Sequence, residues 1–180
     1  MSEMLSVIVS VPSLSLKEII NGVKTVDIRR TKPKTNEPFK VYLYCTKGSG
    51  TLWILDKETR KNFPDKIADV FTAESCGSAL KGNGKIIGEF ICDKVYVGKC
   101  GKYCDIPLNK AQIDAYDLLM FANGKTVYGW NISNLLIYDK PRELSEFTVP
   151  VSYKNGTQRQ QMIFKQGLKP PQSWVYAEEV

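Results

Sequence analysis

Histidine is absent from this chain of 180 residues. Without it, a Ser-His-Asp or Cys-His catalytic arrangement cannot form within the chain, and a histidine-containing zinc site is excluded as well. Long apolar runs are also missing, since none approaches the roughly 20 residues that a membrane helix needs. The apolar run at residues 5–11 is short, and no basic segment precedes it. We therefore expect no secretory signal, no membrane partner and a cytoplasmic location.

Cysteine is scarce, and its spacing does not indicate a metal site. There are five cysteines, and the closest pair, Cys100 and Cys104, does not form Cys-x-x-Cys. No second pair completes a four-cysteine site. We expect reduced thiols, no metal and no cofactor, with a zinc or redox pair as the alternative. A phosphate loop at 82–85 is rejected, because Ala79 and Ile86 stand where the pattern needs glycine and Ser or Thr.

The overall composition is that of one soluble globular domain with a substantial core. Apolar residues make up 43% of the chain and charged residues 24%. Lysine and arginine outnumber aspartate and glutamate by 25 to 19, a formal charge of +6. This balance favours an anionic partner, nucleic acid first, although solubility alone also explains it.

Alternating apolar residues predict about six strands. Besides a short strand within 22–30, the candidates are 5–11, a half-buried strand at 39–46, 51–55, and two long strands at 85–97 and 126–138. Asn155-Gly156 is typical of a hairpin turn. The pattern favours a small mixed barrel with helices outside it, an α+β fold.

Two or three helices are expected between these strands. Ser15 and Glu18 fit a capping box for a helix of about two turns that ends at Gly22. A longer helix should begin at Asn109 and end at Asn123-Gly124. A third helix could run from Pro64 to Phe71, and a helical turn could follow at 141–147.

The segment Gly22–Arg30 concentrates charge where a strand should begin. Successive side chains of a strand point to opposite faces, so Val26 and Ile28 should enter a core. Thr25, Asp27 and Arg29 would then share the other face. A carboxylate and a guanidinium side by side suit polar recognition or proton chemistry better than packing.

Three segments of the chain resemble the ASCH domain family, relatives of the PUA RNA-binding barrel. Gly22-x-Lys24-Thr25-x-Asp27-x-Arg29 resembles the signature Gly-x-Lys-x-x-Glu-x-Arg, with Asp27 in place of the usual glutamate. Residues 86–90 resemble the central strand of the family, and 128–132 followed by 138–141 resemble its closing strand. The resemblance implies a PUA-like barrel with a cleft between the first helix and the sheet.

The resemblance also implies that the cleft binds RNA or a modified nucleoside. Lys24, Arg29 and the adjacent Arg30 would line it, with Thr25 beside them, and contact phosphate or a base edge. Asp27 would orient Arg29 or accept from a base amino group. The alternative for these residues is a surface salt bridge.

Tyr128 and Trp130 are the aromatic residues that the resemblance places at the cleft. Either ring would stack on a base. The alternative for both is packing in the core.

A hydrolase is the alternative function, because some small ASCH members resemble amidohydrolases acting on acetylated cytidine and others are linked to RNA cleavage. Lys24 and Asp27 would then be the catalytic residues. The family threonine falls at Asp27, so Thr25 on the same face could substitute for it, and Glu89 could serve as a carboxylate. A lysine acts as a base only if its pKa is depressed, which Arg29 and Arg30 would favour and Asp27 would oppose. Whether the chain is an enzyme stays open.

The resemblance divides the chain into a domain and an extension. Residues 1–147 form the ASCH/PUA-like domain, with an insertion at about 47–84 that could recruit a protein partner. Residues 148–180 form a C-terminal extension packing on that domain, and its Pro-Pro-Gln-Ser-Trp segment resembles phage-type members.

Overall fold

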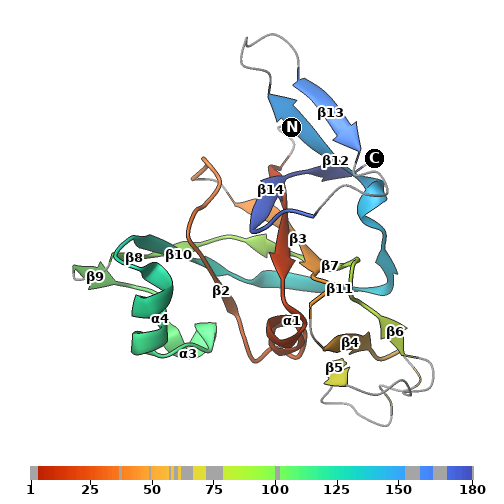
Figure 1. The fold of residues 1–180 in the computed structure, drawn as a ribbon, viewed down its shortest axis with the longest axis horizontal. Helices are drawn as coiled ribbons and strands as arrows, with labels where there is room; N and C mark the ends of the chain where they lie inside the picture. The colour runs from red at the N-terminus through yellow and green to blue at the C-terminus, as the bar shows by residue number, and fades with distance from the viewer. Residues whose placement is uncertain are drawn as a thin grey trace.

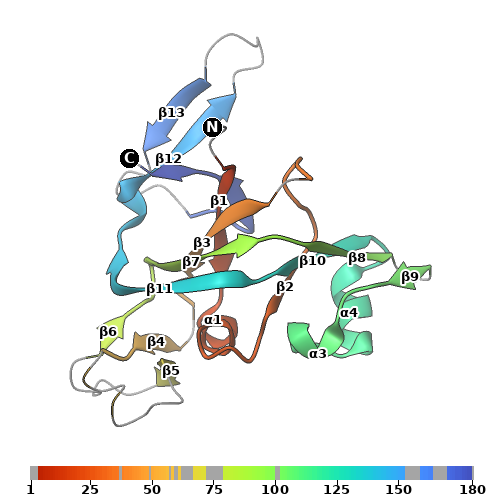
Figure 2. The same ribbon diagram turned by 180° about the vertical axis from the view of Figure 1, so that it is seen from behind.

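The fold is of the α+β class, as expected, and consists mostly of sheet. The computed structural model describes residues 4–36, 38–48, 50–56, 58, 61, 67–71, 79–99, 102–152, 159–163 and 170–179. Two larger sheets share the main core, and two smaller sheets lie at opposite ends of the molecule (Figures 1 and 2). The strands among the described residues pair into these separate sheets and do not close into one continuous barrel.

The larger sheet has the order β11-β7-β3-β1-β14. Its strands are β1 (Ser6–Val11), β3 (Phe39–Cys45), β7 (Ile86–Cys92), β11 (Ser133–Arg142) and β14 (Trp174–Tyr176). β1 and β3 run parallel, and the other neighbours pair antiparallel. The C-terminal segment therefore supplies an edge strand of the central sheet, next to the first strand of the chain.

Strand β3 forms where the sequence predicted it, but it is buried on both faces, so only the predicted half-burial was wrong. Val41 and Leu43 face the main core, whereas Tyr42 and Tyr44 belong to a second core. That second core contains Phe147 from the start of β12 (Phe147–Ser152), whose ring lies edge-on to Tyr42. The residues after position 146 cover the face that the alternation had left to solvent.

The second sheet has the order β2-β10-β8-β9. Its strands are β2 (Val26–Arg29), β8 (Val95–Lys99), β9 (Tyr103–Cys104) and β10 (Thr126–Asn131). Each long predicted strand is divided between the two sheets, because β7 passes into β8 at residues 93–94 and β10 passes into β11 at Ile132. These two crossings hold the sheets against each other.

The helices form where apolar residues recur, but several of their boundaries differ from the predicted ones. α1 (Ser13–Ile20) starts two residues before Ser15 with Pro12 at its N-cap, so the expected capping box does not form. It ends as expected, with Gly22 at φ +74°.

A left-handed Gln112 (φ 52°) divides the expected long helix into α3 (Leu108–Ala111) and α4 (Ala115–Ala122). The helical turn η1 (Leu144–Glu146) is confirmed.

Within residues 47–84 the described strands form a small sheet, in the order β5-β4-β6. These strands are β4 (Thr51–Ile54), β5 (Ala68–Phe71) and β6 (Leu80–Lys81). The helix expected at 64–71 is wrong at its described end, since β5 pairs with β4 there. The Asn21 side chain fixes this edge by accepting from the Ile67 N–H at 2.8 Å and donating to the Ala68 carbonyl at 2.8 Å.

The last sheet contains β13 (Arg159–Ile163) and β15 (Glu178–Glu179) on either side of β12. β12 and β13 pair antiparallel, as the hairpin prediction required, and the Asn155-Gly156 turn itself lies outside the described residues. None of the helices in the described part of the chain has the length and apolarity needed to cross a membrane.

Candidate functional site

Asp27 and Arg29 lie on one face of β2, as strand alternation predicted. Val26 packs on the other face with Ile106 and Ala111, close to α3. Asp27 is nevertheless buried, and its Oδ2 accepts a hydrogen bond from Arg29 Nε at 2.6 Å. The side chains of Asp27 and Arg29 are only 6% and 11% exposed. The polar face of β2 therefore points into the space between the two large sheets.

Arg29 joins three segments of the chain at this point. One terminal nitrogen, Nη2, donates to the Ser10 carbonyl of β1 at 3.1 Å, and Nη1 lies 3.5 Å from the Ser173 carbonyl just before β14. Asp27 thus orients a guanidinium that ties β2 to the edge of the larger sheet. A planar group with several donors is suited to such bridging.

Lys24, Thr25 and Arg30 do not join this ion pair. Lys24 is half-buried at the end of the α1–β2 connection, where its N–H donates to the Glu18 carbonyl at 3.0 Å. Thr25 is held through its backbone: its N–H donates to the Lys110 carbonyl at 2.8 Å. Arg30 is exposed and turns toward α4, donating to the Phe121 carbonyl at 3.1 Å.

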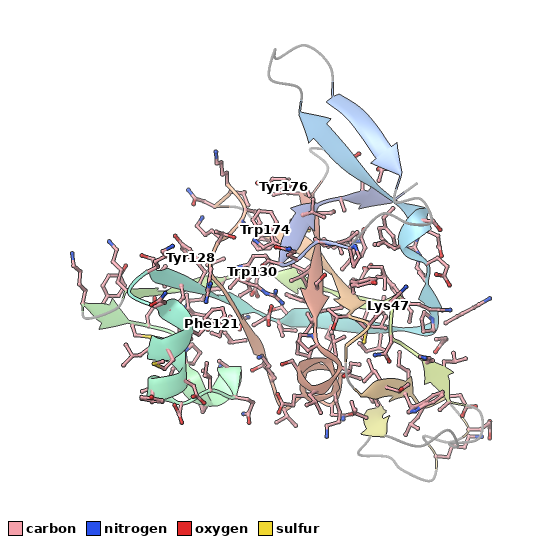
Figure 3. The ribbon with its side chains drawn as sticks, in the orientation of Figure 1. Lys47, Phe121, Tyr128, Trp130, Trp174 and Tyr176 are labelled. Carbon is pink, nitrogen blue, oxygen red and sulfur yellow. The ribbon has the colours of Figure 1, made fainter. Side chains whose placement is uncertain are left out.

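Tyr128 and Trp130 face the ion pair from the neighbouring strand. Tyr128 is directly opposite Arg29, and Trp130 is directly opposite Asp27. Trp130 is fully buried, with its ring edge-on to Phe39 at 5.1 Å between centroids, and its Nε1 has no hydrogen-bond partner among the described residues. Tyr128 is half-buried at the margin of the same core (Figure 3). The geometry at Trp130 is that of core packing.

Trp174 and Tyr176 of β14 extend this aromatic group, and the sequence reasoning missed them. The Trp174 ring lies 5.9 Å from Trp130 and 5.3 Å from Tyr176 between centroids (Figure 3). Trp174 Nε1 donates to Thr31 Oγ1 at 2.9 Å, and the Tyr176 hydroxyl accepts from the Lys34 N–H at 3.2 Å. The Pro-Pro-Gln-Ser-Trp segment marked this region only as an extension; nothing in it indicated pairing with β1.

Comparison with known proteins gives matches among solved structures alone. No protein family model matches the chain, and no curated protein matches it. The crystal structure of ASCH from Zymomonas mobilis is 13% identical with a TM-score of 0.50, covering 95% of this chain and 86% of that one. A tyrosine-to-phenylalanine mutant of that protein is 12% identical with a TM-score of 0.51, and the match covers 95% of this chain and 88% of the mutant chain. A serine-to-alanine mutant of the same protein is 13% identical with a TM-score of 0.57, and the match covers 95% of this chain and 87% of the mutant chain.

The chain has an ASCH-type fold. The match extends over nearly the whole chain. At this level of identity the likeness concerns the fold, and the chemistry of the site must come from the residues themselves.

Within the ASCH-type fold, Glu89 is separated from Asp27 by the larger sheet. Glu89 is opposite Tyr42, on the face of that sheet away from the main core. Its carboxylate accepts from the Tyr138 hydroxyl at 2.6 Å and pairs with Lys40 Nζ at 3.2 Å. Glu89 thus belongs to a polar cluster of its own.

Two further features of this structure concern the surroundings of the predicted site. Cys92 is buried in the main core, and burial raises the pKa of its thiol to about 12, with the Asp27 carboxylate as a minor cause. A cavity of about 150 Å³ lies between α4 and the β8–β9 hairpin. Its lining residue Val127 points to the face of the second sheet opposite Trp130, so this cavity is distinct from the expected cleft.

Proposed function

We propose that this chain binds single-stranded RNA or a nucleoside within it through a basic-aromatic face formed by Lys32, Lys34, Trp174 and Tyr176. The observation that carries the proposal is the pair of hydrogen bonds from β14 to the loop after β2. They hold a loop with two cationic side chains, those of Lys32 and Lys34, beside two partly exposed aromatic rings. Cations neutralise phosphates, and each stacked base contributes about 1–3 kcal/mol.

The ASCH-type fold supports this reading at the level of fold, since PUA-like domains are RNA-binding. In the proposal, Asp27 and Arg29 act as the frame that fixes β2, β1 and the segment before β14, because both side chains are nearly buried. Lys24 contributes a phosphate contact near the start of β2. Tyr128, half-buried opposite Arg29, is a further ring for stacking, and the fully buried Trp130 supports it from behind.

Binding is favoured over hydrolysis by the surroundings of Asp27. A catalytic carboxylate needs access to a substrate proton, whereas Asp27 is buried and its Oδ2 is engaged by Arg29 at 2.6 Å. Glu89 is occupied by Lys40 and Tyr138 on another face. An assay of acylated nucleosides and RNA for turnover tests this point, and product release that is abolished by Lys24→Ala would favour the hydrolase.

The binding experiment titrates labelled single-stranded RNA at several salt concentrations. We expect Lys32→Ala/Lys34→Ala to weaken binding and to make the dependence of log affinity on log salt shallower by about 1.4, since each phosphate contact on a single strand contributes about 0.7. The matched control is Lys81→Ala/Lys140→Ala, two exposed lysines on other strands. Equal affinity of both double variants would overturn the proposal.

A second arm separates the basic-aromatic face from the predicted cleft. Lys24→Ala removes one cation next to the α1–β2 connection without touching the loop that β14 holds. A loss as large as that of the double variant would move the site to the cleft beside α1, whereas the proposed face requires a smaller loss.

A further inference from the structure

Helix α4 presents an apolar stripe to solvent. Leu118 and Ala122 pack into the core beneath the helix. On the opposite side, Tyr116, Leu119 and Met120 are 69%, 51% and 63% exposed. Their i, i+3, i+4 spacing makes them neighbours on one helix face. Contiguous apolar surface of this kind on a soluble protein marks an interaction site more often than scattered apolar residues do.

The cavity of about 150 Å³ continues this stripe toward β9. Leu119 belongs to both, because it lines the cavity and is half exposed beside Met120. Tyr103, which is 54% exposed, forms the opposite wall. The stripe and the cavity together form one apolar surface that is hollowed on one side, and we refer to it as the α4 surface.

Charges of opposite sign stand at the two ends of the α4 surface. Asp114 caps the N-terminus of α4, and Asp117 follows in its first turn. Lys99 and Lys102 line the cavity at the other end. Lys99 is opposite Thr126, and Thr126 lies four residues after Ala122, the last residue of α4. The surface is therefore acidic at the start of α4, apolar along its middle and basic beyond its end.

We propose that the α4 surface is the interface of a homodimer in which the two α4 helices pack antiparallel. A two-fold interface must be complementary to itself, because the same patch meets its own copy. Antiparallel packing places the acidic end of each helix against the basic end of the other, so that Asp117 meets Lys102 of the partner subunit. The apolar stripes meet between these charges and lose their contact with water.

The charge arrangement selects a second copy over other occupants. An RNA strand would meet carboxylates at Asp114 and Asp117, and an acidic peptide would meet the same repulsion at that end. A second copy satisfies both ends at once. The basic-aromatic face is built from β14 and the loop after β2, so the dimer leaves it available for its own ligand.

Sedimentation velocity over a wide range of protein concentration tests the association. We expect a reversible dimer for the native chain. Leu119→Gln/Met120→Gln should raise the dissociation constant at least about tenfold, as expected for residues at the centre of an interface. Leu14→Gln is the matched control, since Leu14 is an exposed helical leucine (62%) on α1. A native chain that stays monomeric throughout would overturn the proposal.

Charge exchange tests the antiparallel arrangement. Asp117→Lys and Lys102→Glu should each weaken self-association, because each brings like charges together. An equimolar mixture of these two variants should dimerise again, since each contact then pairs opposite charges. A mixture that stays monomeric would overturn the arrangement. Unchanged far-ultraviolet circular dichroism and RNA affinity show that each variant is folded. Loss of the dimer on addition of RNA would assign the surface to the nucleic acid instead.

Discussion

Arg29 Nε lies 2.6 Å from Asp27 Oδ2, and the two side chains are almost fully withdrawn from solvent. Two residues that share one face of a four-residue strand thus form an internal ion pair. The remaining guanidinium nitrogens reach the Ser10 and Ser173 carbonyls. The pair connects the second sheet to the first strand of the larger sheet and to the residue just before β14, so its loss should affect the whole fold.

Replacing Arg29 by methionine should destabilise the protein strongly. The change leaves Asp27 with a nearly buried charge and no partner, a defect that typically costs about 3–5 kcal/mol. Chemical denaturation should show the loss as a lower midpoint. The double variant Asp27→Asn/Arg29→Met removes both charges and should be more stable than Arg29→Met alone. A loss equal to that of an exposed surface pair, under about 1 kcal/mol, would show that solvent reaches the carboxylate.

Removing the Tyr176 hydroxyl should loosen the basic loop without unfolding the core. That hydroxyl accepts from the Lys34 N–H at 3.2 Å. Tyr176→Phe keeps the ring packed against Trp174 and removes only the acceptor. Hydrogen exchange should become faster at the Lys34 amide and its neighbours, and RNA affinity should fall modestly. Tyr128→Phe is the control, because among the described residues it is the Tyr176 hydroxyl, and not that of Tyr128, that bonds to this loop. Unchanged exchange at Lys34 would contradict the anchoring role.

Local sequence patterns predicted strands at 5–11, 39–46 and 51–55 and the side-chain parity of β2 correctly, because alternation depends only on neighbouring residues. They placed Val26 inward and Asp27 with Arg29 on the other face. They did not predict that this other face is covered as well. It is covered by β1 and by β14. Strand β14 lies more than 140 residues after β2 in the sequence, and no local pattern encodes its pairing with β1.

The same limit explains the helix and strand boundaries that were wrong. Gln112 adopts a left-handed conformation that is uncommon for glutamine, and no glycine in the sequence marks the break between α3 and α4. The residues at 68–71 form a strand because β4 and Asn21 supply partners for their backbone. Of the two predicted aromatic residues, Trp130 lies in the core and Tyr128 is half-buried, whereas the unpredicted Trp174 and Tyr176 are partly exposed on the edge strand β14.

The buried thiols should make the protein less stable in alkaline solution. Burial raises the pKa of both Cys45 and Cys92 from the ordinary value of 9.0 to about 12. Below pH 9 the thiols are protonated in the folded and unfolded states, and their contribution is fully present. Between about pH 9 and 12 only the unfolded chain releases these protons, so the free energy of unfolding falls as pH rises. Cys45→Ala and Cys92→Ala should each make this decline shallower in denaturation series.

Thiol labelling provides an independent measurement of the same property. Alkylation proceeds through the thiolate, so Cys45 and Cys92 should react far more slowly than the exposed Cys104 at about pH 8. Peptide mapping by mass spectrometry reads each site separately. Comparable rates at Cys92 and Cys104 in the native protein would contradict the burial of Cys92.

Asn21→Ala should release the small sheet β5-β4-β6 from the main body of the protein. The Asn21 side chain accepts from the Ile67 and Ala68 N–H groups and donates to the Ala68 carbonyl, and Ala68 is fully buried. Leaving such groups without partners costs about 1–3 kcal/mol, borne locally where α1 meets β5. Limited proteolysis within residues 47–84 should accelerate, while hydrogen exchange in β1, β3 and β7 stays unchanged. Asn109→Ala, an exposed asparagine on α3, is the matched control. Equal cleavage rates in the two variants would show that packing of the sheet against α1, rather than Asn21, holds it in place.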